Sequence, residues 1–344
     1  MDGTSLPKRP TLSDVARRAG LSKSTASLVF QGSPLVARAT RERILAAADE
    51  MAYVYNRRAA SMRTSRSHTV GLLIPGLANP FFGALVQAVE EELAPSGYTL
   101  LLANTLEDNG RQAGLIRTFL EYRVDGVLVV PAIGTKASAF DFLKKDGTPT
   151  VVLTRHVPGL KSDWVGSDDS AGGALAASHL LQHGCARLAY FGGPEQAYAR
   201  SQRSDAFAEA VRSHGAELDE RWCVGTATSS SAGYEAACTL LQAADPPEGI
   251  ACHSDAIAFG LIRALTERGH TVGEAVRVVG FDDVEHARMA VPSLSSISVS
   301  SDQMGRSAAR LLVSRTQGLT AGQIMTSVIE PSLRARESCG CQEA

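Results

Sequence analysis

Residues 11–30 read as two short helices joined by a tight turn, and this pattern limits the possible fold more than any other stretch. Apolar residues recur at helical spacing in its first half, where Thr11 is placed to cap the first helix. Gly20 is placed to end that helix, and Ser22 to cap the next one. This is the helix-turn-helix pattern, which puts its second helix in the major groove of DNA. A purely structural helical hairpin is the alternative.

The charges of the chain are divided unevenly. The 344 residues carry a formal net charge of −2, yet the first 67 hold 12 Lys and Arg against 5 Asp and Glu. A basic head on an acidic body is typical of a small nucleic-acid-binding module joined to another domain. The sequence contains no apolar run typical of a signal peptide or a membrane span, so we expect a cytoplasmic protein without membrane contacts.

The rest of the chain changes from helical patterns to alternating strands and helices. Residues 41–52 predict a third helix with Ile44, Leu45, Ala48 and Met51 on its buried face. From residue 69 onward, apolar strands alternate with amphipathic helices, and the alternation restarts near residue 165. This order favours two parallel sheets covered by helices, with ligands bound at the carboxyl ends of the strands. We therefore expect a binding cleft between two doubly wound lobes.

Several stretches resemble the lactose-repressor (LacI/GalR) family of bacterial transcription regulators, and the resemblance covers residues 10–338. The matching stretches are Thr11–Ser22, Thr40–Ile44, Asn56–Thr64, Asn79–Phe82, Val279–Asp283 and Leu333–Ser338. The resemblance implies a sequence-specific DNA-binding repressor whose operator affinity is controlled by a small molecule, a sugar or nucleoside-like polyol. It also implies a homodimer on pseudo-palindromic double-stranded DNA. A solute-binding protein without a regulatory role is the alternative, because periplasmic sugar-binding proteins share the expected body.

The resemblance implies an N-terminal all-α helix-turn-helix head and an α/β body of two doubly wound lobes resembling a periplasmic binding protein. The expected parts are the head (1–55), a hinge helix or linker (56–67), the N-terminal lobe (68–166 and 297–326) and the C-terminal lobe (167–296 and 327–344).

By this resemblance the second helix reads base edges in the major groove. Leu28 stands where the family usually has Arg, which predicts contact with a thymine methyl in place of a guanine. Packing of Leu28 inside the head is the alternative. Met62 stands where the family inserts an apolar wedge into the minor groove. The expected DNA contacts are Thr11, Lys23, Ser24, Thr25, Ser27, Leu28, Gln31, Asn56, Arg57, Ala59 and Met62.

Arg203 and Asp282 are the leading candidates for contacts with the small molecule. Relatives have a ligand-binding Arg at the position of Arg203, and a carboxylate after a buried strand, such as Asp282, can accept hydrogen bonds from ring hydroxyls. An ion pair between these two residues is the alternative. The expected effector contacts are Asn79, Phe81, Phe82, Arg155, Arg203, Ser254, Asp255, Phe281 and Asp282, of which Phe281 is also a candidate for the core.

Neither an enzyme nor a metal site is indicated by the sequence. It has no glycine-rich phosphate loop after a strand and no credible Ser-His-Asp set. His179 and His183 lie four residues apart on one expected helix, but no Glu follows His179 as in a metalloprotease, so we expect both to be surface or packing residues. We interpret Cys339 and Cys341 as a flexible, exposed thiol pair. We therefore expect no catalytic residue, no cofactor and no metal.

Overall fold

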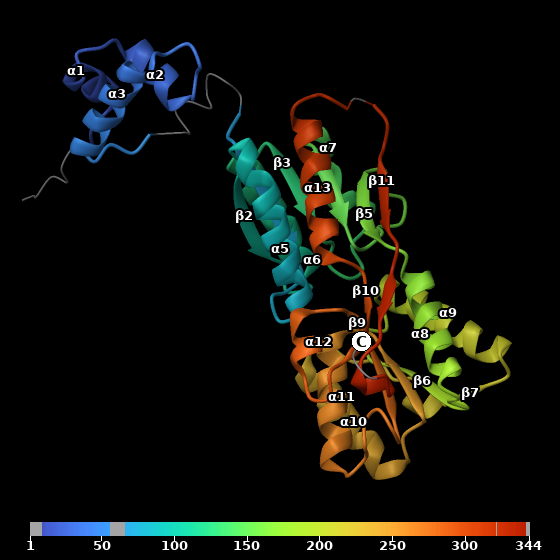
Figure 1. Cartoon of the computed structure of the whole chain (residues 1–344). Helices are drawn as coiled ribbons and strands as arrows, with labels where there is room; N and C mark the ends of the chain where they lie inside the picture. The colour runs from blue at the N-terminus through green and yellow to red at the C-terminus, as the bar shows by residue number, and fades with distance from the viewer. Residues whose placement is uncertain (1–8, 56–65, 321, 342–344) are drawn as a thin grey trace, which may run out of the picture. The chain divides into compact units, whose positions relative to one another are not determined.

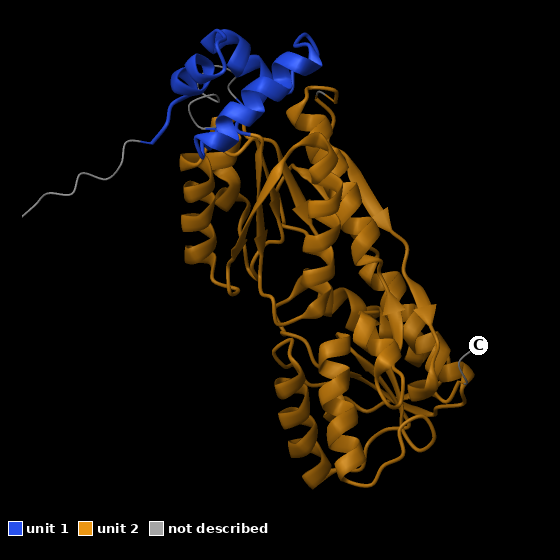
Figure 2. Cartoon of the chain, turned by 60° about the vertical axis from the view of Figure 1, so that its left-hand side comes forward, with its two compact units in different colours: residues 1–67 blue, residues 68–344 orange. Residues whose placement is uncertain are grey.

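The computed structural model describes residues 9–55, 66–320 and 322–341. The chain divides into two compact units, residues 1–67 and residues 68–344, which Figure 2 shows in blue and orange. The first unit is helical and the second is built from strands and helices. None of the helices in the described part of the chain combines the length and the apolar character that crossing a bilayer needs.

The first unit contains the expected helix-turn-helix. Its helices are α1 (Leu12–Arg18), α2 (Lys23–Phe30) and α3 (Arg38–Glu50). Thr11 and Asp14 form a capping box at the start of α1, in which the Thr11 N–H donates to the Asp14 carboxylate at 3.0 Å. Gly20 has a φ of +64°, which allows the chain to turn sharply after α1. Ser22 then caps α2.

The third helix differs from its expected bounds, because it covers residues 38–50 and not 41–52. Ile44 is fully buried, as expected, but Leu45 is 42 % exposed, so its expected burial is wrong. Consecutive residues are turned by about 100° around a helix axis, and Ile44 already faces the core. Ala47 and Ala48 complete the buried face.

The second unit contains two six-stranded sheets flanked by helices, as expected (Figure 1). The first sheet has the order β11-β5-β4-β3-β1-β2, and its pairs are parallel. The second has the order β12-β10-β9-β8-β6-β7 and is parallel except for β12. The strands are β1 (Thr69–Ile74), β2 (Thr99–Asn104), β3 (Gly126–Val129), β4 (Thr150–Leu153), β5 (Asp163–Ser167), β6 (Arg187–Phe191), β7 (Glu217–Leu218), β8 (Gly249–Cys252), β9 (Arg277–Asp282), β10 (Ser295–Ser298), β11 (Thr326–Ile329) and β12 (Ser332–Arg334).

Helices cover the faces of both sheets, and the strands supply a nearly continuous apolar core. In the first lobe, α13 packs beside α5 although the two are far apart in the sequence (Figure 1). The α-helices of the body are α5 (Pro80–Leu93), α6 (Asn109–Glu121), α7 (Asp141–Asp146), α8 (Asp169–Gln182), α9 (Tyr198–Ser213), α10 (Ser230–Ala243), α11 (Asp255–Glu267), α12 (Glu285–Met289) and α13 (Ser301–Thr316). The 3-10 helices are η1 (Ala94–Ser96), η2 (Ala137–Phe140), η3 (Glu220–Trp222) and η4 (Glu337–Cys339).

The chain passes between the two lobes after β5, β10 and β11. Strand β10 belongs to the second sheet and β11 to the first. The expected boundaries at 297 and 327 therefore fall inside strands, and the crossings lie beyond residues 298 and 329. The serine-rich sequence of β10 carries little apolar pattern, so its pairing with β9 and β12 reveals the strand where the sequence does not.

Helices α8 and α9 cross closely because α8 has a glycine at their contact. A Cβ atom at Gly173 would lie 2.1 Å from the carbonyl oxygen of Arg203. We expect Gly173→Ala to lower the free energy of unfolding by about 1–3 kcal/mol in urea denaturation, because the helices must separate. Gly114→Ala on α6, where a Cβ meets nothing within 4 Å, is the matched control and should stabilise through helix propensity. Equal stability of Gly173→Ala and the wild type would contradict the prediction.

Candidate functional site

One face of α2 is exposed while the opposite face packs into the head. Ser24, Leu28 and Gln31 follow one another at helical spacing and are exposed, whereas Ala26 and Val29 are buried. Leu28 is 37 % exposed, so it does not pack inside the head. The helix therefore presents a narrow face with small polar side chains around one leucine, which a DNA groove can accept.

The other expected DNA contacts of the head differ in their exposure. Lys23 and Thr11 are exposed, and the Thr25 hydroxyl lies 2.8 Å from that of the capping serine. Ser27 is only 7 % exposed, and its hydroxyl accepts a hydrogen bond from Gln31 Nε2 at 3.3 Å. Its expected contact with a base therefore involves a side chain that is largely buried in the free head. The expected hinge contacts Asn56, Arg57, Ala59 and Met62 lie outside the described residues.

A cavity of about 380 Å³ lies between the two lobes, at the carboxyl ends of strands from both sheets. Asn79 Nδ2, from the first lobe, donates to Asp282 Oδ2, from the second, at 3.2 Å. Seven of the nine expected effector residues line the cavity. They are Asn79, Phe81, Phe82, Arg155, Arg203, Ser254 and Asp282.

Arg203 is held in the cavity wall by three contacts. Its Nε donates to Asp169 Oδ1 at 2.7 Å, and its Nη1 donates to the His253 carbonyl oxygen at 2.8 Å. The guanidinium carbon lies 3.5 Å from the centre of the Phe281 ring. Arg203 thus pairs with Asp169, and the expected alternative of a pair with Asp282 is wrong. The arrangement fixes one positive charge in a buried wall that few water molecules can screen.

Asp282 adds a carboxyl group on the second-lobe side of the cavity. It is 7 % exposed, and burial raises the pKa of Asp282 to about 7. Arg203 and the hydrogen bond from Asn79 act to lower this pKa, while Asp169 acts to raise it. Asp282 therefore changes its charge near neutral pH, in the wall of the cavity.

Backbone strain is concentrated at this cavity. Four non-glycine residues that line it have positive φ angles: Leu106, Glu107, Thr154 and Asp282. Such conformations cost about 1–3 kcal/mol each and cluster at binding sites and clamps. The Thr154 hydroxyl is also buried, without a hydrogen-bond partner among the described residues. A ligand in the cavity could supply that partner.

Two expected effector contacts lie behind the cavity wall and are corrected to structural roles. Phe281 is only 2 % exposed, and its ring packs against the Arg203 guanidinium. Neighbouring residues of a strand point to opposite faces, so Asp282 reaches the cavity and Phe281 does not. The Asp255 carboxyl accepts hydrogen bonds from Ser296 Oγ at 2.6 Å and from the Val284 N–H at 2.8 Å. Burial raises the pKa of Asp255 well above its usual value.

Sequence reasoning missed several residues of the wall. Asp169 and Thr154 follow strands β5 and β4 closely, so the position after a strand end could have found them. Glu107 holds Arg155 through two hydrogen bonds of 2.8 and 2.9 Å. No local signal connects these two, since 48 residues separate them. The Arg155 charge is therefore paired before a ligand arrives.

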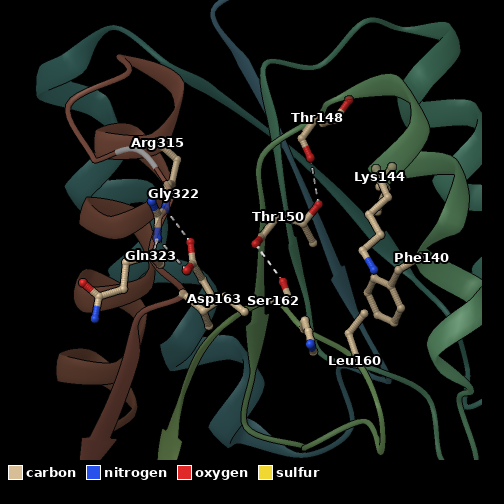
Figure 3. A pocket seen from close by; sticks show the side chains of 13 residues that line it. Phe140, Lys144, Thr148, Thr150, Leu160, Ser162, Asp163, Arg315, Gly322 and Gln323 are labelled. Atoms are coloured by element: carbon tan, nitrogen blue, oxygen red, sulfur yellow. Dashed lines mark hydrogen bonds and ion pairs between the residues drawn. The ribbon is translucent and has the colours of Figure 1, made fainter.

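A second cavity, of about 270 Å³, lies within the first lobe, at the amino ends of β4 and β5 (Figure 3). Arg315 and Asp163 face each other across one side of it and form an ion pair at 2.7 Å. Arg315 also donates to the carbonyl oxygens of Thr320 and Gln323. The charges of Arg315 and Asp163 are thus already paired, and the cavity lies away from the strand ends that bind ligands in such folds.

Each of the two units matches a known protein family. Residues 11–56 match the family described as bacterial regulatory proteins, lacI family, and residues 177–339 match a periplasmic binding protein-like domain. The HTH-type transcriptional repressor PurR of Mannheimia succiniciproducens is 30 % identical over 329 residues, which are 95 % of this chain and 98 % of that protein.

Solved structures of transcriptional regulators are also similar to this chain. The transcriptional regulator CelR in complex with cellobiose is 32 % identical, with a TM-score of 0.71 over 96 % of this chain and 100 % of that one. A LacI family transcriptional regulator from Enterococcus faecium with bound ribose is 30 % identical, with a TM-score of 0.69 over 78 % of this chain and 98 % of that one.

Proposed function

This chain belongs to the LacI family of bacterial regulatory proteins, and we propose that it is a repressor whose operator affinity is set by a sugar bound between its two lobes. The chain is a DNA-binding regulator and not an enzyme. The alternative of a solute-binding protein without a regulatory role leaves the helix-turn-helix head without a purpose.

The observation that carries the proposal is the cavity with charged walls from both lobes, joined by the Asn79–Asp282 hydrogen bond. A ligand that replaces this bond, or strengthens it, changes the preferred angle between the lobes. Strand β1 begins at Thr69, directly after the linker of residues 56–67, so movement of the first lobe acts on that linker. Effector and operator are thereby coupled, and the coupling must be reciprocal.

The chemistry of the cavity favours a sugar. The Asp282 carboxylate can accept hydrogen bonds from ring hydroxyls, and the Asn79 amide can both accept and donate them. Arg203 can donate to ring or hydroxyl oxygens. Phe81 and Phe82 lie edge to face, with ring centres 5.3 Å apart, and offer an apolar wall for a sugar face. Relatives of known structure hold cellobiose and ribose. A nucleoside is the second ligand class to test, since it carries similar hydroxyls.

On the DNA side, we propose that two chains pair through their first lobes and present two heads to a pseudo-palindromic operator. The exposed face of α2 would enter the major groove, with Lys23 on a phosphate and Ser24 and Leu28 at base edges. The segment from Asn56 to Met62 would contact the minor groove between the half-sites. Sedimentation of the full chain with and without operator tests the proposed dimer.

The function is tested with operator duplexes selected from a random pool by the full-length chain. Fluorescence anisotropy then measures operator affinity with and without ribose, cellobiose, other sugars and nucleosides. We expect one sugar class to change the affinity about 5–150-fold in either direction, and the operator to change sugar affinity by the same factor. The proposal fails if no duplex is selected, or if no sugar changes the affinity.

Leu28 is expected to determine one base of the operator. Leu28→Arg should move the preference at one position of each half-site toward guanine by about 1–3 kcal/mol, because arginine can donate two hydrogen bonds to that base. Competition between selected duplexes measures this shift. Leu35→Arg, which adds the same charge at a loop residue that is 86 % exposed, is the control and should leave base preference unchanged. Identical preference in Leu28→Arg and the wild type would remove Leu28 from the interface.

A further inference from the structure

Four side chains that the proposed function does not use come together in the second lobe. His179 lies on α8, and His183 is the cap residue at the end of that helix. Cys339 ends η4, and Cys341 follows it by two residues. One ligand atom from each of the four lies within 4.8 Å of the others, and Cys341 Sγ is 3.4 Å from His183 Nε2.

The two cysteines are held firmly, which corrects the expectation of a flexible, exposed pair. The Ser338 hydroxyl donates to the Val278 carbonyl oxygen at 2.7 Å and accepts from the Ser295 N–H at 2.8 Å. Gly340 has a φ of +86°, and a Cβ there would lie 2.5 Å from the Gly273 carbonyl oxygen. The tail therefore packs closely against the second lobe. Cys339 is fully buried as a result.

The two histidines face the same site because residues four apart share one face of a helix. His179 is only 8 % exposed, and its Nε2 is buried without a hydrogen-bond partner in the described part of the chain. A buried polar atom without a hydrogen-bond partner destabilises the folded chain. Since His179 belongs to the same cluster as two cysteine sulfur atoms and a second imidazole, a metal ion would be a natural partner for its ring.

We propose that His179, His183, Cys339 and Cys341 bind a zinc ion. Two thiolates and two neutral imidazoles form a closed tetrahedral Zn²⁺ site and neutralise its charge. Bond lengths of about 2.3 Å to sulfur and about 2.0–2.1 Å to nitrogen place the ligand atoms about 3.3–3.8 Å apart. The cluster needs to contract by about 1 Å from its widest separation to reach this geometry. The ion fastens the C-terminal tail to α8.

The test uses the full-length chain, reduced with a phosphine that binds metals weakly and freed of metal by chelation. Co²⁺ is the probe, because tetrahedral cobalt with thiolate ligands has intense visible bands and a charge-transfer band. Zn²⁺ is then added to displace it. Cys341→Ser and His183→Gln each remove one ligand. If the first variant does not fold, the second still tests the site. Cys238→Ser and His214→Gln change the same residue types on α10 and after α9, away from the cluster.

We expect one tetrahedral Co²⁺ per chain, displaced by Zn²⁺, and a higher melting temperature in Zn²⁺. Each ligand variant should weaken Co²⁺ binding more than about 100-fold, which exceeds the usual effect of losing an outer-shell partner. Cys341→His, which keeps a ligand, should retain binding, as should both controls. The proposal is wrong if the reduced wild type binds no Co²⁺. It is also wrong if the ligand variants bind it like the wild type, or if the chain accepts metal only after a Cys339–Cys341 disulfide has formed.

Discussion

Arg203→Met is expected to lower the free energy of unfolding of the body by about 3–5 kcal/mol, because it leaves the Asp169 carboxylate buried without its cation. The two side chains are 11 % and 9 % exposed, and they are joined by a 2.7 Å hydrogen bond. The substitution also removes the donor to the His253 carbonyl oxygen and the charge above the Phe281 ring. Chemical denaturation followed by circular dichroism measures the loss.

The double variant Arg203→Met/Asp169→Asn separates charge pairing from ligand binding. It should recover much of the lost stability, because it removes both buried charges together. It should still show no sugar-dependent rise in melting temperature, since the cavity would lack its fixed cation. Arg263→Met serves as the control, because its ion pair with Glu267 is exposed and should contribute little. Sugar binding by the double variant at wild-type affinity would contradict the assignment of Arg203.

Asp282 is expected to make both stability and sugar binding depend on pH. Its folded-state pKa is raised to about 7, whereas an unfolded aspartate titrates near about 3.9. Between these values the folded chain binds more protons than the unfolded chain, so the contribution of Asp282 to stability falls as pH rises. The change amounts to about 4 kcal/mol over the whole interval. A sugar hydroxyl that donates to the carboxylate should bind more tightly as pH rises through 7.

Asp282→Asn should remove the share of this dependence that Asp282 contributes while keeping a side chain of similar shape. The share from Asp255, whose pKa is also raised by burial, should remain. Denaturation midpoints between pH 4 and 7, and calorimetric titration with the sugar between pH 6 and 8, measure the two effects. Asp205→Asn, an exposed position on α9, is the control and should keep the wild-type slopes. If Asp282→Asn keeps the full wild-type slopes, the pH dependence comes from other groups and Asp282 does not bind the ligand through its carboxylate.

The expectation that ligands bind at the carboxyl ends of parallel strands identified many residues of the cavity. It could not distinguish which side chains near those ends reach the cavity. Asn79, Arg155 and Asp282 were found because each follows or ends a parallel strand. Phe281 is in the core, the other role expected for it, because alternate residues of a strand point to opposite faces. Asp255 was misplaced because its carboxyl turns inward to the Ser296 hydroxyl.

The helix-turn-helix head and the two-lobed body could both be predicted from local sequence patterns. Caps such as Thr11, the turn at Gly20 and the spacing of apolar residues act over a few residues, so they can be read locally. The pairing of Arg203 with Asp169 and the proximity of Cys339 to His179 could not be predicted in this way. These partners are distant in the chain, and their contacts form when separate helices, strands and the tail pack together. Local propensity contains no information about such contacts, because many arrangements of the same elements bury similar apolar surface.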